Sequence, residues 1–174
     1  MAVLLSFART RVFDILGVTS NQRMMTMHVR DYDEQDFEAV AAVYANAKLD
    51  ELRFEQRPFT LTPLGDDPVI LSAFRESTVL VCEDGGIGGI VGFAASAPGQ
   101  LRALFVHSDA RGRGVGQALL SAVMAKERGP LSLNVAKSNT PAVGFYEKFG
   151  FAVAAETTRQ YDGMSIAYCR MARI

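Results

Sequence analysis

The 174-residue sequence contains no tryptophan, two cysteines and two histidines. Cys82 and Cys169 lie far apart, and each falls in a segment that we expect to be a β-strand. His28 and His107 have no ligand-forming neighbour at a spacing typical of metal sites. This scarcity predicts two buried free thiols, with no disulfide and no metal site. Free thiols are compatible with a reducing cytoplasm, where we expect the protein to act.

Long hydrophobic runs and a surplus of one charge are also missing. No apolar run approaches the ~20 residues of a membrane-spanning helix. The formal net charge is −1, so no long-range field attracts nucleic acid or an anionic membrane. We therefore expect no nucleic-acid partner and no membrane association. Apolar residues make up 49% and charged residues 21%, an ordinary composition for one globular domain with a sizeable core.

The most informative stretch is a glycine-rich turn between an expected strand and an expected helix. Residues 101–106 are largely apolar, residues 111–116 read Arg-Gly-Arg-Gly-Val-Gly, and apolar residues recur at helical spacing over 117–124. Glycine permits positive φ and close approach of a ligand. The unsatisfied first amides of the helix favour a phosphate group, which Arg111 and Arg113 would contact as well. The alternative is a tight turn that binds no ligand.

Two common phosphate loops do not match this turn. A Walker loop ends in Gly-Lys-Ser/Thr, whereas Gly116 is followed by Gln117. A dinucleotide fingerprint needs a further glycine at position 117 or 119, and position 119 is Leu119. The order Arg-x-x-Gly-x-Gly after an apolar strand instead resembles the acyl-CoA loop of the GCN5-related N-acetyltransferases, the GNAT family.

A second stretch strengthens this resemblance. Residues 139–151 read Asn-Thr-Pro-Ala-Val-Gly-Phe-Tyr-Glu-Lys-Phe-Gly-Phe. They are similar to the second GNAT signature, Asn-x-x-Ala-x-x-x-Tyr-x-Lys-x-Gly-Phe, and they follow the first motif at a suitable distance. The resemblance covers residues 79–151 well and the rest loosely. Within the family, residues 101–151 are most similar to the small bacterial YjaB-like acetyltransferases.

The expected elements follow the order βααβββαβαββ. Strands are expected over 28–31, 78–83, 90–95, 101–106, 131–136, 152–158 and 165–171, with a hairpin turn over 84–89. The order matches the GNAT fold, an α/β (α+β) architecture with a mixed, mostly antiparallel twisted sheet flanked by helices. In the family, the irregular region 48–67 forms one wall of the acceptor site. Its charged residues either line that site or form a solvated loop; they are Glu51, Arg53, Glu55 and Arg57.

The resemblance implies acetyl-CoA as co-substrate and no metal. The backbone at the end of the central strand would pair with the pantetheine arm, and one amide there would polarise the thioester carbonyl; these residues are Leu104, Phe105 and Val106. The pyrophosphate would lie on the loop and the first helical turn, which comprise Arg111, Gly112, Arg113, Gly114, Val115, Gly116 and Gln117. Asn139 is implied as a coenzyme contact, or it caps the helix that begins near Pro141.

The resemblance also makes Tyr146 the catalytic residue. A hydrogen bond from its phenol would stabilise the developing thiolate, whereas the alternative is a core aromatic beside Phe145. Many relatives have a glutamate at the position matching Asn134, and an asparagine cannot accept a proton at neutral pH. His107 and Glu83 are the remaining candidates for the base, together with a water chain or an acceptor that is already partly neutral.

The predicted function is an N-acetyltransferase that moves an acetyl group from acetyl-CoA to a primary amine of a small molecule. The alternatives are a protein N-terminal or lysine acetyltransferase, and a non-catalytic acyl-CoA-binding module. We expect the GNAT domain over residues 27–174 after an N-terminal extension, 1–26, with an amphipathic helix over 3–16. The extension packs on the domain, pairs with another copy or is disordered, so a monomer and a homodimer are both compatible with the sequence.

Overall fold

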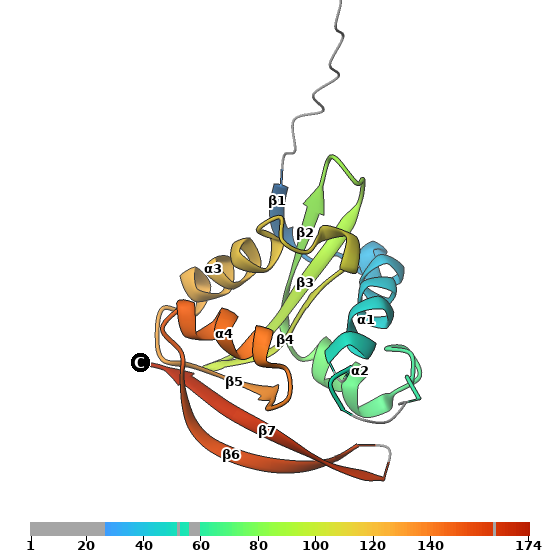
Figure 1. The fold of residues 1–174 in the computed structure, drawn as a ribbon. Coiled ribbons are helices and arrows are strands. Elements are labelled where there is room, and N and C mark those ends of the chain that lie inside the picture. Colours follow the sequence, from blue (N-terminus) through green and yellow to red (C-terminus); the bar gives the residue numbers. More distant parts are fainter. Residues whose placement is uncertain (1–26, 52, 56–59, 162) are drawn as a thin grey trace, which may run out of the picture.

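One sheet of seven strands runs through the molecule in the order β1-β2-β3-β4-β5-β7-β6 (Figure 1). The structure is a computed structural model and describes residues 27–51, 53–55, 60–161 and 163–174. The predicted helix over 3–16, the extension 1–26 and Arg57 lie outside the described residues. The strands are β1 (Met27–Asp31), β2 (Thr78–Asp84), β3 (Ile90–Ala97), β4 (Gln100–Val106), β5 (Leu131–Ala136), β6 (Ala152–Tyr161) and β7 (Met164–Arg173).

Four α-helices complete the fold, and the observed order βααβββαβαββ confirms the prediction. They are α1 (Phe37–Glu51), α2 (Pro68–Arg75), α3 (Val115–Glu127) and α4 (Thr140–Lys148). Capping side chains begin two of them: Asp33 caps the 3₁₀ turn that leads into α1, and Asp67 accepts the Val69 and Ile70 amides at the start of α2. Gly150, with φ of 83°, follows the end of α4.

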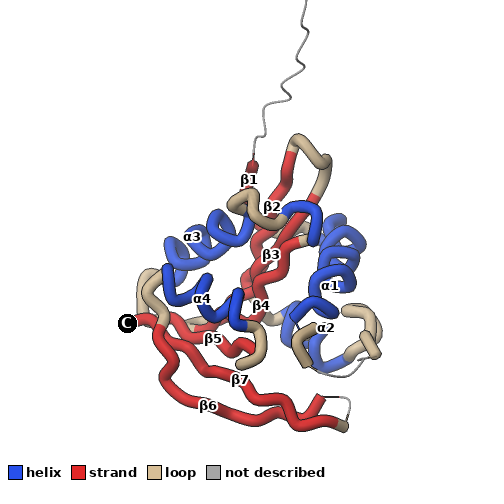
Figure 2. Tube along the Cα trace, viewed as in Figure 1, coloured by secondary structure: helices blue, strands red, loops and turns tan. Residues whose placement is uncertain are grey.

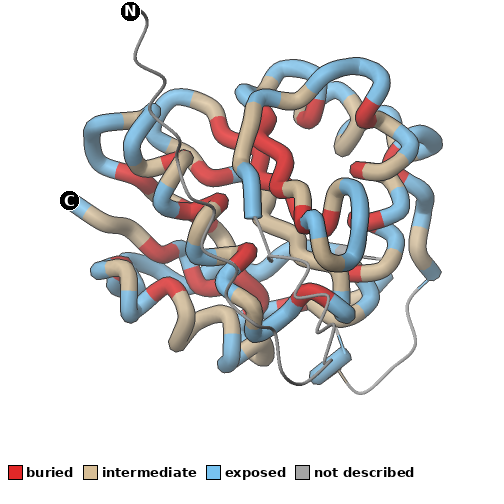
Figure 3. The backbone as a smooth tube through the Cα atoms, turned by 90° about the horizontal axis from the view of Figure 1, so that it is seen from above, coloured by how far each residue is buried: buried red, intermediate tan, exposed pale blue. Residues whose placement is uncertain are grey.

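The helices cover both faces of the sheet, α1 and α2 on one side and α3 and α4 on the other (Figure 2). Successive residues of β2 and β3 enter opposite cores: Leu80 packs with the α3 side, whereas Val81 and Phe93 pack with the α1 side. Most residues of both strands are buried, which makes the strands part of the centre of the molecule. Figure 3 shows the buried segments running through the interior, with exposed segments around them. The predicted free, buried thiols of Cys82 and Cys169 are confirmed.

A glycine in β3 lets the start of α3 lie directly on the sheet. A Cβ at Gly92 would stand 2.8 Å from Val115 Cγ1 and 3.0 Å from the Phe105 carbonyl oxygen. Only a residue without a side chain fits there. The loop that was predicted to bind phosphate is therefore held against the central strands.

The strand pairings are antiparallel with one exception. The β2–β3 pair confirms the hairpin expected over 84–89. The exception is β4 with β5, which run parallel. The chain between them crosses over through α3, as a parallel pair requires.

Candidate active site

β4 and β5 are neighbours in the sheet, but they pair only where both begin. Within the described residues their ladder consists of Gln100 opposite Ser132, whereas β4 stays paired with β3 as far as Val106. Figure 1 shows β5 turning away from β4 beyond this point. β4 therefore presents a backbone edge to the gap along Leu104, Phe105 and Val106, whose side chains are only partly buried. Such an edge can accept an extended ligand as an added strand.

The loop after β4 ends at the N-terminus of α3. Gly112 and Gly114 have φ of 71° and 91°, the left-handed region that favours glycine. Gly114 is the N-cap of α3, and no side chain of the described part of the chain caps this end. The Ala118 amide makes the first helical bond, 2.9 Å from the Gly114 oxygen, so the three amides before it have no acceptor inside the helix. This geometry is that of an anion-binding turn.

Arg111 joins this loop to α1. Its Nε donates to the Val106 carbonyl at 3.2 Å, and its guanidinium pairs with the Asp50 carboxylate near the end of α1. Both side chains of the ion pair are about one-third exposed, 37% for Arg111 and 35% for Asp50. An exposed pair of this kind contributes about 0–1 kcal/mol, so a stronger anion can replace Asp50 at little cost.

Arg113 is held more firmly. Its Nη2 lies 3.0 Å from the Asp84 carboxylate, whose side chain is 3% exposed. Asp84 also accepts the Gly86 amide at 2.7 Å, so it fixes the β2–β3 hairpin and the loop together. Removing one partner of a buried pair leaves an uncompensated charge, which makes this contact costly to break.

Asn139 has the capping role that the sequence offered as one of two. It is the N-cap of α4, and its side-chain oxygen accepts the Ala142 amide at 3.3 Å. The coenzyme contact remains a prediction. A cap of this kind fixes where α4 begins, and therefore where Tyr146 stands.

Tyr146 lies on α4 within the core between α3, α4 and the sheet. It is 8% exposed, and its ring packs edge-on against Phe145 and Phe151 at centroid distances of 5.2 and 5.8 Å. Burial raises the pKa of the Tyr146 phenol, and the negative charge of Glu51 raises this pKa further. The hydroxyl therefore stays protonated at neutral pH, as a hydrogen-bond donor to a thiolate must.

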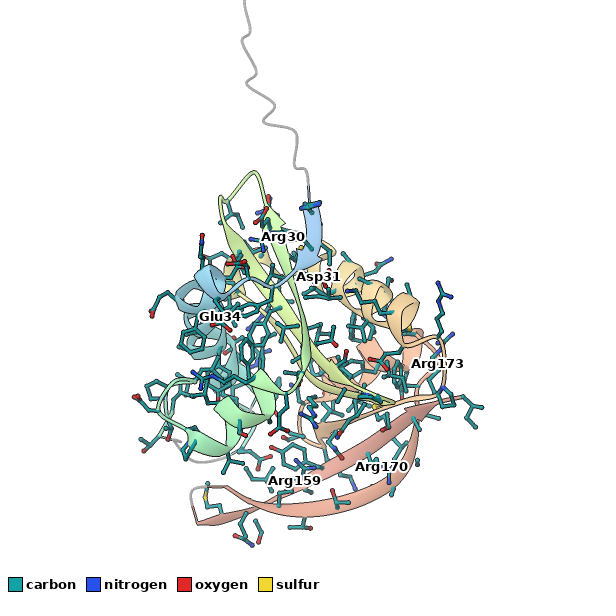
Figure 4. The ribbon with its side chains drawn as sticks, turned by 180° about the vertical axis from the view of Figure 1, so that it is seen from behind. Arg30, Asp31, Glu34, Arg159, Arg170 and Arg173 are labelled. Carbon is teal, nitrogen blue, oxygen red and sulfur yellow. The ribbon has the colours of Figure 1, made fainter. Side chains whose placement is uncertain are left out.

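The structure gives the candidates for the base very different surroundings. Asn134 is half-buried on β5, opposite Arg170 of β7. Glu83 accepts two hydrogen bonds from Arg30, at 2.8 and 2.6 Å. Figure 4 shows Arg30 at the β1 edge, at the opposite end of the sheet from Arg170.

His107 has a local structural contact. Its Nδ1 accepts the Asp109 amide at 3.3 Å and caps the short turn after β4. Which group takes the proton from the acceptor amine stays a prediction.

Three contacts hold the end of α1 and the segment after it over the gap. Asn46 exchanges two hydrogen bonds with Ser108, at 2.8 and 3.2 Å, on the loop after β4. Asp50 pairs with Arg111 of the same loop. Beyond the helix, Glu55 accepts the Ser138 hydroxyl at 2.6 Å on the loop after β5. The charged segment after residue 48 is therefore bound to both walls of the gap.

Sequence reasoning missed several of these residues. Gly92 carried a visible signal, since a glycine inside an apolar strand indicates close approach of another segment. Asp50 and Asp84 carried none, because their partners lie 61 and 29 positions away in the sequence.

The described part of the chain has no group of three or more His, Cys, Asp or Glu side chains that could hold a metal ion. Over the same ranges, no helix is both long and apolar enough to cross a membrane.

A family model described as "Acetyltransferase (GNAT) domain" matches residues 75–153. These residues form a GNAT domain. The match includes the gap between β4 and β5, the glycine loop, α4 and Tyr146. Both sequence motifs lie inside this match, and the GNAT prediction is confirmed for residues 75–153.

Named relatives agree with this assignment. The GNAT domain is 40% identical over 67 residues to "Peptidyl-lysine N-acetyltransferase YjaB" of Salmonella typhimurium, an alignment that covers 38% of this chain and 46% of the relative. The protein of the same name from Escherichia coli is 38% identical over 85 residues, covering 45% of this chain and 56% of the relative. The chain thus spans about half the length of the curated relatives it matches.

Solved structures share the fold of the GNAT domain. The apo form of YjaB from Escherichia coli superposes with a TM-score of 0.68 at 24% identity, covering 86% of this chain and 99% of that one. YncA, a putative acetyltransferase from Salmonella typhimurium solved with acetyl-CoA, gives a TM-score of 0.63 at 18% identity, covering 84% and 92%. The predicted mixed, mostly antiparallel sheet flanked by helices is confirmed.

Proposed function

We propose that this protein is an acetyl-CoA-dependent N-acetyltransferase that acetylates a primary amine. The observation that carries the proposal is the gap between β4 and β5, which ends at a glycine-capped helix N-terminus. An extended arm fits the free strand edge, and a pyrophosphate fits the helix end. The GNAT family model supports this reading, as does the structural neighbour whose description includes acetyl-CoA.

In this proposal the chain holds acetyl-CoA mainly through its backbone. The edge over Leu104, Phe105 and Val106 pairs with the pantetheine arm, and an amide there polarises the thioester carbonyl. The pyrophosphate lies on the amides of residues 112–117. Arg111 exchanges its exposed Asp50 partner for the phosphate, whereas Arg113 stays with Asp84 and keeps the loop in shape. Asn139 contacts the coenzyme while it caps α4.

The reaction forms a C–N bond and breaks the C–S bond of the thioester. The nitrogen of a primary ammonium carries three protons and the amide product carries one. One proton therefore leaves through a base to solvent, and the other ends on the sulfur of free coenzyme A. Tyr146 donates a hydrogen bond to the departing sulfur and stabilises its negative charge, with its phenol kept protonated by burial.

For the acceptor we propose a small-molecule amine. A second candidate is a lysine side chain, because two relatives bear the name peptidyl-lysine N-acetyltransferase. A non-catalytic acyl-CoA-binding module is the alternative from another class, and the buried phenol of Tyr146 argues against it. We further propose that residues 27–174 form the catalytic domain, that it acts in the cytoplasm, and that it is a monomer or a homodimer.

Binding and turnover test this function separately. Millimolar acetyl-CoA should raise the melting temperature, since a ligand bound only by the folded state stabilises it by mass action, while NADH should not. Thiol release from acetyl-CoA should then appear with some members of a panel of primary amines and lysine peptides. The absence of any thermal shift would contradict the proposal, and a shift without turnover would favour the binding module.

A further inference from the structure

One face of α1 leads along the side of β4 toward the gap. Tyr44, Lys48 and Glu51 are spaced at i, i+4 and i+7, so they share this face. The Tyr44 ring packs edge-on against Phe105 of β4 at 5.5 Å, and Lys48 Nζ lies 5.9 Å from the centre of the Phe105 ring. Lys48 then donates to Glu51 Oε2 at 2.6 Å. This series of contacts brings Glu51, the last residue of α1, beside the open edge of β4.

The contacts around Glu51 hold it over the gap. Asn46 ties the preceding helical turn to Ser108 on the β4 side, and Glu55 ties the following segment to Ser138 on the β5 side. Glu51 stands between these two bridges, and its side chain is 19% exposed. A carboxylate in this position is partly shielded from water but reachable from the gap.

Tyr146 lies on α4, on the opposite face of the sheet from α1. Its pKa is raised by the charge of Glu51 as well as by burial, although the two residues belong to helices that cover opposite faces of the sheet. Because β4 and β5 have separated at this height, no ladder lies between them there. The phenol and the carboxylate are therefore close enough for the charge of Glu51 to act on Tyr146.

We propose that Glu51 binds the ammonium group of the acceptor and takes the proton that it must lose before it attacks the thioester. This role rests on the proposed function, since it concerns the same reaction. Glu51 accepts one proton from R–NH₃⁺, and the neutral amine then forms the C–N bond. The second N–H proton ends on the sulfur as the C–S bond breaks, and Glu51 returns its proton to solvent.

Glu51 is better suited to this role than the other candidates. Asn134 has no basic oxygen at neutral pH, Glu83 is bound twice by Arg30, and His107 uses Nδ1 for a backbone amide. Glu51 is paired with Lys48, and a carboxylate offers about four acceptor positions, so an ammonium can join that pair. The ligand that this site recognises is a primary alkylammonium group, which a small amine and a lysine side chain both carry.

The experiment compares a cationic and a neutral acceptor. Butylamine is an ammonium at neutral pH, whereas butanoic hydrazide is neutral and has no such proton to lose. Glu51→Gln should lower kcat/KM for butylamine by about 10²-fold, the lower end of general acid–base catalysis. Turnover of the hydrazide should stay close to that of the wild type. A lysine peptide, assayed beside butylamine, shows which source of the alkylammonium the enzyme prefers.

Two further variants distinguish the effect of losing the Glu51 carboxylate from the effect of losing its ion pair or another carboxylate of α1. Glu38→Gln removes an exposed carboxylate elsewhere on α1 and should leave all rates unchanged. Lys48→Met breaks the same ion pair but keeps the carboxylate, so it should lose less turnover than Glu51→Gln. The thermal shift with acetyl-CoA should persist in every variant, which shows that each one folds and binds.

The outcomes that overturn the two proposals differ. Unchanged butylamine turnover in Glu51→Gln overturns the role of Glu51 and leaves the proposed function intact. The role of Glu51 is also overturned if Lys48→Met loses as much butylamine turnover as Glu51→Gln. It is likewise overturned if the wild type acetylates the hydrazide but not butylamine. A wild type that binds acetyl-CoA but acetylates no acceptor of any kind overturns the proposed function, and the role of Glu51 with it.

Discussion

Residues that look alike in the sequence differ in how firmly the fold already holds them. Arg111 and Arg113 stand two positions apart in one loop, and both were predicted to contact phosphate. Arg111 pairs with a partly exposed carboxylate that it can release, whereas Arg113 pairs with the buried Asp84. We therefore propose that Arg111 contacts the phosphate directly and that Arg113 supports the loop.

Tyr146→Phe should lower turnover while leaving acetyl-CoA affinity unchanged. The hydroxyl matters most when the sulfur carries charge, which happens only along the reaction, so kcat and kcat/KM should fall together. We expect a loss of about 10²-fold, since a thiolate is already a tolerable leaving group. Steady-state rates with an accepted amine, together with a binding assay for acetyl-CoA, measure both quantities.

The phenyl ring keeps its packing against Phe145 and Phe151, so the variant should fold. Equal turnover in the variant and the wild type, with chemistry shown to limit the rate, would return Tyr146 to the role of a core aromatic.

At the scale of elements, the site is the junction of one strand, one loop and one helix. β4 supplies a free edge, the loop supplies two glycines with positive φ, and α3 supplies uncapped amides. Gly92 seats this junction directly on β3. The strand, the loop and the helix therefore act together, and a change in the backbone of the loop should affect binding more than folding.

Gly114→Val and Gly116→Val should abolish acetyl-CoA binding. Gly114 has φ of 91°, which costs a residue with a side chain roughly 1–3 kcal/mol and would displace the loop. At Gly116 a Cβ would lie 3.6 Å from the Phe145 ring and 3.7 Å from Val106, so the larger valine side chain would press on these residues and displace the first turn of α3, where the pyrophosphate is expected. Calorimetry with acetyl-CoA measures the loss.

Gly144→Ala is the matched control for these loop variants. Gly144 lies in α4, and no atom outside its own helix lies within 4 Å of the Cβ that the change would add. It should therefore bind acetyl-CoA normally and gain up to about 1 kcal/mol of stability from helix propensity. Normal binding by the Gly114 and Gly116 variants would mean that the phosphates lie elsewhere.

For the whole molecule, a thiol buried in one of the two cores makes stability depend on pH. Cys82 lies in β2 and is fully buried in the core on the α3 side. Burial, reinforced by the charges of Asp84 and Glu83, raises the pKa of its thiol from 9.0 to about 11. The folded state therefore keeps this proton at pH values where the unfolded chain has released it.

The free energy of unfolding should consequently fall as the pH rises above 9. The contribution of the buried thiol is fully present below pH 9 and is lost as the pH rises through about 11, which amounts to about 2–3 kcal/mol. Urea unfolding of the wild type and of Cys82→Ala at several pH values measures this contribution as the difference between the two free energies of unfolding. All other groups titrate alike in both proteins. A difference between the two proteins that stays constant across this range would contradict the assignment.

Removal of residues 1–23 should leave a folded domain that binds acetyl-CoA. The sheet, all four helices and both cores lie within the described residues from Met27 onward. The truncated chain should have the same urea midpoint and the same thermal shift with acetyl-CoA as the full chain. Insolubility of the truncated chain would show that the N-terminal segment belongs to the core or to an obligate interface.

The order of the elements and the position of the glycine loop could be predicted from the sequence because their signals are local. The glycines of the hairpin and the period of the apolar residues each act within a few positions. The motifs around Arg111 and Tyr146 likewise predicted the family, since they are continuous in the sequence. Predicted roles in coenzyme binding and catalysis follow from that family membership.

Only the tertiary structure decided which groups face one another. The gap exists because β5 pairs with β7 along its length and with β4 only at its start, a long-range choice that no local pattern expresses. The partners Asp84 and Arg113 meet because α3 packs on the β2–β3 hairpin. Glu51 and Tyr146 are 95 positions apart, and the charge of Glu51 acts on the Tyr146 phenol only because the tertiary structure brings their two helices near one another.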